Sequence, residues 1–217
     1  MNRLSPLRLS AAAAALLGLA ACAGAPAPVA RLAAPAVAPE TAPLSGPLAA
    51  MAKPRAPLTG DISATNLIDG APVTLRARAS GDTVRVVQSD GCAWTRWGDW
   101  FAPSDSWANC GESQNWHTGQ ATVRPVGSLW PLRPGAEAGY VRNATSHTGR
   151  TYTRETRCRV TGSEAVIRPS GAATPAHVVA CADGKRVRTT WFAEGEGPVA
   201  FRAVHEENGV EEAWVRN

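Results

Sequence analysis

The sequence carries none of the usual catalytic signatures. It has no H-E-x-x-H pair, no G-x-S-x-G turn and no glycine-rich loop for a phosphate or a dinucleotide. Asp99 and Asp105 could form a carboxylate pair of the kind that a glycan hydrolase uses, but acids in loops are far more often solvated charges. We therefore expect no catalytic residue, no cofactor and no metal site. Each of the four histidines stands in a different segment (His117, His147, His177 and His205).

Lysine and long apolar runs are also scarce. Lys53 and Lys185 stand against 20 arginines, and the chain has no basic run of the kind that binds nucleic acid. The formal net charge of +4 falls to +2 if Arg3 and Arg8 are removed with the N-terminal segment. The longest apolar run, residues 9–21, is shorter than the roughly 20 residues with which a helix spans a bilayer. We expect neither a nucleic-acid partner nor a membrane-spanning helix.

The N-terminus has the layout of a secretion signal, because two basic residues precede a short apolar run that ends in small residues. The segment Leu19-Ala20-Ala21-Cys22 resembles the lipobox of bacterial lipoprotein precursors at all four positions. The resemblance implies that residues 1–21 are a cleaved signal peptide. It also implies a diacylglycerol on the thiol of Cys22 and a further acyl chain, such as palmitate, on the new amino group. Anchoring by more than one acyl chain is stable.

The residue after Cys22 indicates the membrane. In bacterial lipoproteins an Asp at that position tends to hold the protein at the inner membrane, and this chain has Ala23. The resemblance therefore implies a protein of the cell envelope that is anchored by lipid, in the outer membrane, and faces the periplasm.

Four cysteines remain once Cys22 carries lipid. An oxidising periplasm favours disulfides among them, and four cysteines allow three connectivities. Shorter loops favour Cys92–Cys110 and Cys158–Cys181. A zinc site is the alternative, but the close Cys or His spacing that it needs is missing from the sequence.

Residues 23–57 hold eight of the 17 prolines and no aromatic residue. Such a segment cannot bury enough apolar surface to fold. We expect residues 22–57 to form a lipidated N-terminus and a disordered tether. In a polyproline II conformation, at about 3.1 Å per residue, it would reach on the order of 100 Å. The alternative is a segment with no spacing role.

Residues 58–217 form one β-rich domain in this interpretation. Short β-rich runs alternate with turn signals, and helical periodicity is nearly absent. Residues 58–130 would hold a hairpin and a Trp-rich loop region, and residues 131–217 an antiparallel sheet. We expect a mainly β fold, an antiparallel meander that curls into a barrel, a half-barrel or a sandwich. The expected strands are residues 73–76, 84–87, 121–123, 139–143, 151–160, 164–168, 177–181, 187–192, 199–204 and 212–215.

One expected turn conflicts with an expected disulfide. If Thr161-Gly162-Ser163 is a turn, the run 164–168 is a strand between Cys158 and Cys181. Strands lie about 4.8 Å apart, so the two Cα atoms would be nearly 10 Å apart, whereas a disulfide needs less than about 7 Å. Either that run does not lie between the two cysteines or the pairing is different.

The segment from Cys92 to Cys110 concentrates tryptophan. The spacing of Trp94, Trp97 and Trp100 places them on one face if the segment is a short helix. Packing explains them without a ligand, because each indole buries about 150–250 Å². The alternative is an exposed stacking platform for a sugar ring. Its candidate binding residues are Trp94, Trp97, Trp100, Trp107, Asp99 and Asp105.

These observations leave three hypotheses. The first is a non-catalytic outer-membrane lipoprotein that binds an envelope partner, glycan or protein, through the Trp-rich loop or a sheet edge. The second is a glycan hydrolase that uses acids near that loop. The third is a carrier of an apolar ligand inside the sheet. Exposed indoles would favour the first, paired acids the second, and an apolar cavity the third.

Overall fold

A computed structural model describes residues 37–111 and 113–217, and every regular element in these ranges is a β-strand. The expected signal peptide, Cys22 and the first part of the tether lie outside the described residues. In the part that is described, no helix has the length and apolar character to cross a membrane.

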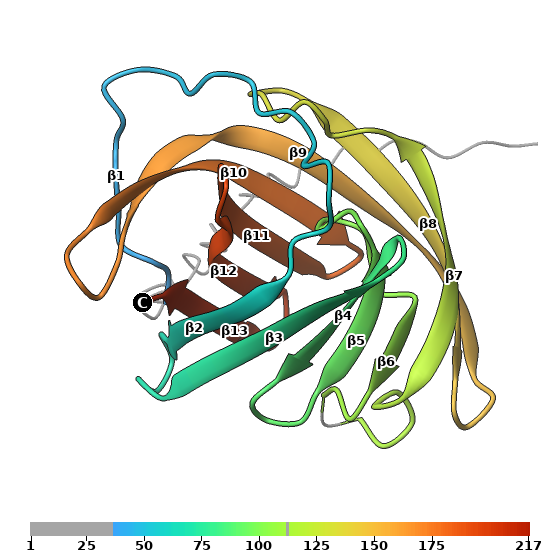
Figure 1. Ribbon diagram of the computed structural model, residues 1–217. Helices are drawn as coiled ribbons and strands as arrows, with labels where there is room; N and C mark the ends of the chain where they lie inside the picture. Colours follow the sequence, from blue (N-terminus) through green and yellow to red (C-terminus); the bar gives the residue numbers. More distant parts are fainter. Residues whose placement is uncertain (1–36, 112) are drawn as a thin grey trace, which may run out of the picture. The chain divides into compact units, whose positions relative to one another are not determined.

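Twelve strands form one closed antiparallel barrel, which confirms the prediction of a mainly β meander (Figure 1). From β2 to β13 each strand pairs with the next one, and β13 closes the wall by pairing with β2. The short β1 adds to β9. The strands are β1 (Thr41–Ala42), β2 (Gly60–Asn66), β3 (Pro72–Ser80), β4 (Thr83–Gln88), β5 (Ala93–Trp97), β6 (Ser106–Ala108), β7 (Gly119–Gly127), β8 (Glu137–Ser146), β9 (Thr151–Ile167), β10 (Ala173–Asp183), β11 (Arg186–Ala193), β12 (Gly197–His205) and β13 (Gly209–Arg216).

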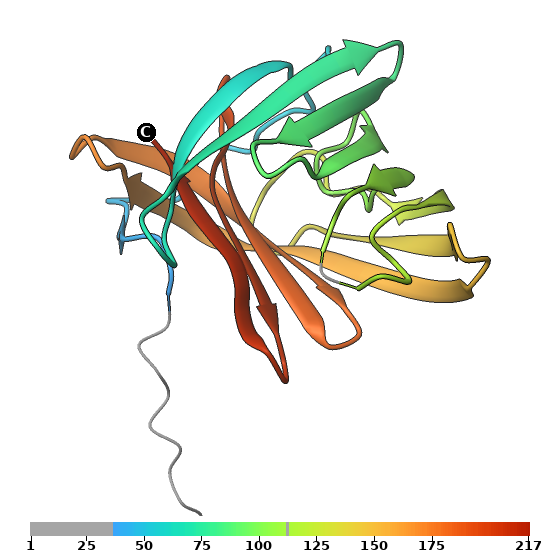
Figure 2. The same ribbon diagram turned by 90° about the horizontal axis from the view of Figure 1, so that it is seen from below.

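The two halves expected from the sequence share this wall, because β7 and β8 pair along nine residues (Figure 2). Alternate connections of a meander lie at the same end of the barrel. We call one end the polar end and define it by connections 89–92, 109–118, 147–150, 184–185 and 206–208. We call the other the apolar end and define it by connections 98–105, 128–136, 168–172 and 194–196.

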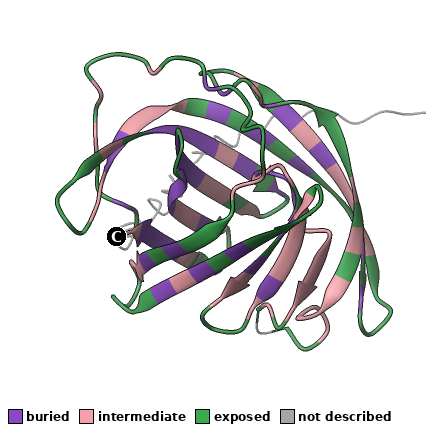
Figure 3. Cartoon of the chain, viewed as in Figure 1, coloured by how far each residue is buried: buried purple, intermediate pink, exposed green. Residues whose placement is uncertain are grey.

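Alternating residues of the strands build the core. In β3, Val73, Leu75 and Ala77 are buried, whereas Arg76 and Arg78 are exposed (Figure 3). This period of two is what a strand with one face toward a core requires.

Aromatic side chains fill the apolar end. Phe101 and Trp130 lie against Phe192 of β11, with ring centroids 5.3 Å and 5.8 Å from it. Burial of such a side chain contributes about 1.5–3 kcal/mol. A cavity beside Leu58 and Phe192 has a volume of only about 20 Å³. It has room for little more than one water molecule, so it does not fit the apolar ligand of the third hypothesis.

Strand β9 resolves the conflict over the second disulfide. It runs unbroken through Thr161, Gly162 and Ser163, so the expected turn there is wrong. Its register with β10 shifts between Val178 and Val179, which marks a β-bulge. Cys158 lies directly opposite Cys181, and their Cα atoms are 4.0 Å apart. The expected Cys158–Cys181 disulfide is therefore confirmed.

Residues 37–57 differ from the expected tether. Thr41 pairs with Val166 of β9, and Met51 is 6% exposed. The backbone of Met51 exchanges two hydrogen bonds with Leu132, at 3.0 and 2.8 Å. The expectation of disorder does not hold for this stretch, because backbone pairing and one buried methionine tie it to the barrel.

Candidate functional site

The tryptophans of the Cys92–Cys110 segment do not share one face. The segment contains β5 and β6 instead of a helix, and successive side chains of a strand point to opposite faces. Trp97 is 56% exposed, whereas Trp94, Trp100 and Trp107 are half-buried. The expected helical face is therefore wrong, and these residues do not form an exposed row of indoles.

Core packing accounts for most of these indoles. Trp94 lies opposite Val86 on β4 and opposite Trp107 on β6, with its side chain toward the barrel interior. Trp94 and Trp100 both pack on the apolar cluster that contains Val86. Trp97 is the one stacking candidate among the four that solvent reaches freely.

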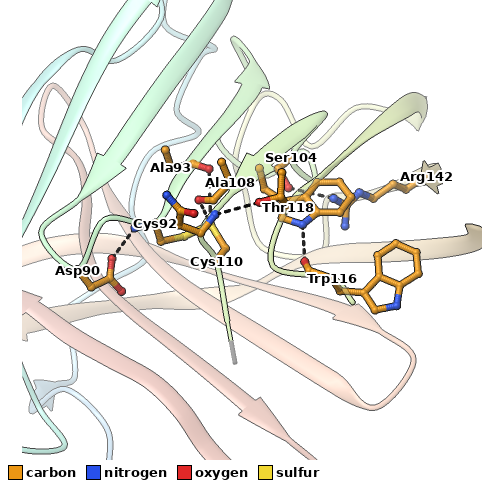
Figure 4. Close-up of a disulfide and its surroundings, with 11 residues drawn as sticks. Asp90, Cys92, Ala93, Ser104, Ala108, Cys110, Trp116, Thr118 and Arg142 are labelled. Atoms are coloured by element: carbon orange, nitrogen blue, oxygen red, sulfur yellow. Dashed lines mark hydrogen bonds between the residues drawn. A yellow bond between two sulfur atoms is a disulfide. The ribbon is translucent and has the colours of Figure 1, made fainter. Parts of the chain in front are cut away.

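The Cys92–Cys110 disulfide is present, with the two Cα atoms 4.6 Å apart, and joins the ends of β5 and β6 (Figure 4). The backbone N–H of Cys110 donates to the carbonyl oxygen of His117 at 2.9 Å. The backbone N–H of Cys92 donates to Asp90 at 2.9 Å. The bridge therefore fixes both strands and the start of the connection to β7.

The acids expected near the tryptophans serve other partners. Asp99 accepts a hydrogen bond from the hydroxyl of Tyr140 at 2.7 Å and another from the backbone N–H of Phe101 at 3.1 Å. Burial, and then the charge of Asp99, raises the pKa of Tyr140. Both Asp99 and Asp105 stabilise the positive charge of Arg96. This arrangement gives the two carboxylates structural roles and does not favour the hydrolase hypothesis.

Charged side chains gather inside the barrel, most of them toward its polar end, whereas Arg96 lies near the end of β5 that leads into connection 98–105. We call this set the luminal cluster. Its members come from six strands and point inward, because each lies opposite an inward residue of a neighbouring strand or contacts another member. The luminal cluster consists of Arg96 (β5), Arg142 (β8), Arg154 (β9), Asp183 (β10), Arg188 (β11) and Glu212 (β13).

Arg142 is held by an aromatic pair. Its guanidinium carbon lies 4.4 Å from the ring centroid of Trp107, which is a cation–π distance. Its Nη1 donates to the hydroxyl of Tyr152 at 2.6 Å and its Nη2 to Ser104 at 3.2 Å. Figure 4 shows Arg142 and its hydrogen bond to Ser104. Burial lowers the pKa of Arg142, and these contacts hold its position.

Arg96 lies deeper in the barrel. Its guanidinium carbon is 4.9 Å from the ring centroid of Trp100, and its Nη1 donates a hydrogen bond to the carbonyl oxygen of Trp100. Burial, together with the charge of Arg188, lowers the pKa of Arg96 to about 10. Glu212 accepts a hydrogen bond from the indole N–H of Trp214 at 3.1 Å, and burial raises its pKa.

Asp183 connects two arginines near the rim. Its Oδ2 accepts a hydrogen bond from Arg188 at 2.8 Å, and its Oδ1 lies 3.7 Å from Arg154, which is an ion-pair distance but too long for a hydrogen bond. Side-chain exposure falls from 48% for Arg154 to 27% for Arg188 and 12% for Asp183. Solvent therefore reaches the luminal cluster from the polar end.

The luminal cluster has more donors than acceptors. The buried Nε atoms of Arg96, Arg142 and Arg188 have no hydrogen-bond partner among the described residues, nor has the indole nitrogen of the inward Trp94. On the acceptor side, only Oδ1 of Asp183 is buried in the cluster without a partner among these residues. An unpaired buried donor costs about 1–3 kcal/mol. The arrangement thus suits a molecule, or ordered water, that supplies acceptors.

Sequence reasoning missed this cluster. Each arginine stands inside a strand at an inward position, where an apolar residue is usual. Arg188, for example, is two residues before the buried Thr190 and therefore shares its face of β11. That interruption is the signal in the sequence. It does not reveal that the arginines meet, because they come from strands far apart along the chain.

No family model, curated protein or solved structure matches this chain. The geometry of the barrel therefore carries the functional argument.

Proposed function

We propose that this protein is a non-catalytic binding protein of the cell envelope whose barrel interior holds a small anionic molecule at its polar end. The observation that carries the proposal is the excess of buried donors on Arg96, Arg142 and Arg188. Guanidinium groups bind carboxylates and phosphates through paired, charge-assisted hydrogen bonds. An anion at this position satisfies donors that the described residues leave unpaired.

The surroundings support the same chemistry. Burial lowers the pKa values of Arg96 and Arg142, which is the response of cations that are removed from water, and for Arg96 the charges of Asp99, Glu212 and Asp105 oppose this effect without cancelling it. The rings of Trp107 and Tyr152 flank Arg142 and hold it in place without neutralising it. An envelope partner remains part of the proposal, because an acidic sugar of a glycan carries a carboxylate of this kind.

Titration calorimetry on the full chain tests the binding site, with inorganic phosphate, citrate and glucuronate as probes. We expect at least one probe to bind saturably and Arg188→Gln to weaken that binding at least about tenfold, because a hydrogen bond to a charged group contributes about 1.5–3 kcal/mol. Arg85→Gln is the matched control, since Arg85 is exposed on β4. If none of the probes binds, or if both variants bind equally well, the interior is not an anion site.

The lipid anchor is a separate part of the proposal and rests on Leu19-Ala20-Ala21-Cys22. Anchored in this way, the barrel would face the periplasm from the outer membrane. Cys22→Ser should abolish labelling by a radioactive fatty acid and leave a larger precursor. Equal label on the wild type and the variant would refute the anchor without affecting the binding site.

A further inference from the structure

Two histidines meet at the polar end, outside the luminal cluster. His117 lies in the connection from β6 to β7, and His147 lies in the turn from β8 to β9. Their ring centroids are 4.3 Å apart, with the ring planes at 62°. The backbone N–H of His147 donates to the carbonyl oxygen of Thr118 at 3.0 Å, so the two segments are joined next to the rings.

Hydrogen bonds set the same tautomer in both rings. Nδ1 of His117 lies 3.0 Å from the carbonyl oxygen of Gln114, and Nδ1 of His147 lies 3.1 Å from the carbonyl oxygen of Thr118. A carbonyl oxygen only accepts, so each Nδ1 carries the hydrogen. In the neutral imidazole each Nε2 then keeps a free lone pair. Metal-bound histidines have this arrangement, in which the second ring nitrogen donates to a carbonyl or carboxylate.

We propose that His117 and His147 together bind one divalent transition-metal ion through their Nε2 atoms. Imidazole nitrogen suits zinc, copper and nickel ions, with zinc–nitrogen bonds of about 2.0–2.1 Å. At that bond length two imidazoles on one ion have ring centroids about 4.5–5.2 Å apart. The observed 4.3 Å is slightly shorter, so a small turn of the exposed His147 ring would let both Nε2 atoms reach one ion. The described residues contain no group of three His, Cys, Asp or Glu side chains around one point, so solvent completes the coordination.

The surrounding structure holds the pair in place. Cys110, which is in the first disulfide, donates its backbone N–H to the carbonyl oxygen of His117. Ser146, next to His147, accepts a hydrogen bond from the backbone N–H of Arg150 at 3.1 Å, which closes the turn. Preorganised ligands lose little entropy when the ion binds.

His205 provides a matched contrast. Its Nδ1 accepts a hydrogen bond from the backbone N–H of Glu207 at 3.2 Å, so its hydrogen is on Nε2 when the ring is neutral. It has the opposite tautomer to His117 and His147 and should contribute nothing to the site.

Titration of the full chain without a histidine tag with zinc, nickel and copper salts tests the proposal. We expect one ion per chain, with copper bound most tightly, and no binding of Mg²⁺. His117→Ala and His147→Ala should each lower the affinity at least about tenfold, and His205→Ala should not change it.

Circular dichroism and melting of each variant show whether it folds. His147→Gln is a second variant for the same test, because His147 is exposed and its replacement leaves the core intact. If the ion does not bind, or if its binding survives the loss of either histidine, the two rings make only an edge-to-face contact. Because Arg188 is not a ligand of this ion, Arg188→Gln should leave metal binding unchanged, which separates this site from the proposed anion site.

Discussion

The indole of Trp107 occupies the space that a side chain at Gly119 would need. A Cβ atom on Gly119 would lie 2.4 Å from Cζ2 of Trp107 and 2.7 Å from the carbonyl oxygen of Thr145. The missing side chain lets the indole lie across β7, where its face meets the guanidinium of Arg142. Gly119 therefore supports the luminal cluster without contacting a charged group.

Gly119→Ala should lower the free energy of unfolding by about 1–3 kcal/mol, the usual cost of overpacking. The backbone oxygen of Thr145 is held in the β7–β8 ladder and cannot easily move away. Urea unfolding measures the change. Gly162→Ala is the control, because Gly162 lies in β9 with no atom within 4 Å of the added methyl. Equal stability of the two variants would contradict the close contact with Trp107.

Trp107 and Trp97 should respond differently to truncation. Trp107→Ala should cost about 3 kcal/mol, because the indole packs on Arg142 and donates to the carbonyl oxygen of Trp116 at 2.6 Å. Trp97→Ala should change stability by less than about 0.5 kcal/mol, because the side chain is largely exposed. Thermal melting compares them. A similar loss in both would mean that Trp97 packs more tightly than its exposure indicates.

The strands and disulfides of the second half were predictable because their signals are local. Alternation and turn residues mark β8 and β10 to β13, and loop length favours the observed cysteine pairs. Thr161-Gly162-Ser163 misled the prediction, since its composition is typical of a turn. Pairing with β10 overrides that local preference, and Gly162 lies beside a register shift, where glycine is common.

The candidate site was hidden for a different reason. A three-residue spacing of tryptophans fits a helix, but the Cys92–Cys110 segment forms a hairpin in which Trp94 and Trp97 face opposite ways. Arg96, Arg142 and Arg188 come from β5, β8 and β11 and approach one another only once the barrel closes. Closure and register depend on pairing between distant strands, which no short pattern in the sequence encodes.

Met51 should stabilise the barrel although it lies in the proline-rich segment. Met51→Ala should lower the free energy of unfolding by about 2–5 kcal/mol, because the side chain is buried in the cluster that contains Leu132. Lys53→Ala is the control, since Lys53 is exposed two residues away. Urea unfolding of the full chain distinguishes the two. If Met51→Ala is as stable as the control, residues 37–57 only rest on the surface.

Glu212 should make the barrel less stable as the pH rises. Burial raises the pKa of this carboxyl and outweighs the opposing effects of the Trp214 hydrogen bond and of Arg96 and Arg188. The folded state therefore keeps the proton to a higher pH than the unfolded chain does. The resulting stability is fully present below the ordinary pKa of about 4.3 and is lost as the pH rises through the folded-state pKa.

Glutamine cannot ionise, yet its amide oxygen can accept the hydrogen bond from Trp214. The melting temperature of Glu212→Gln should thus be close to that of the wild type near pH 4 and higher than that of the wild type at pH 8. The exposed control, Glu155→Gln, should melt at the wild-type temperature at both pH values. A lower melting temperature of Glu212→Gln at pH 8 would mean that the ionised carboxylate is the form that the arginines hold in the folded barrel.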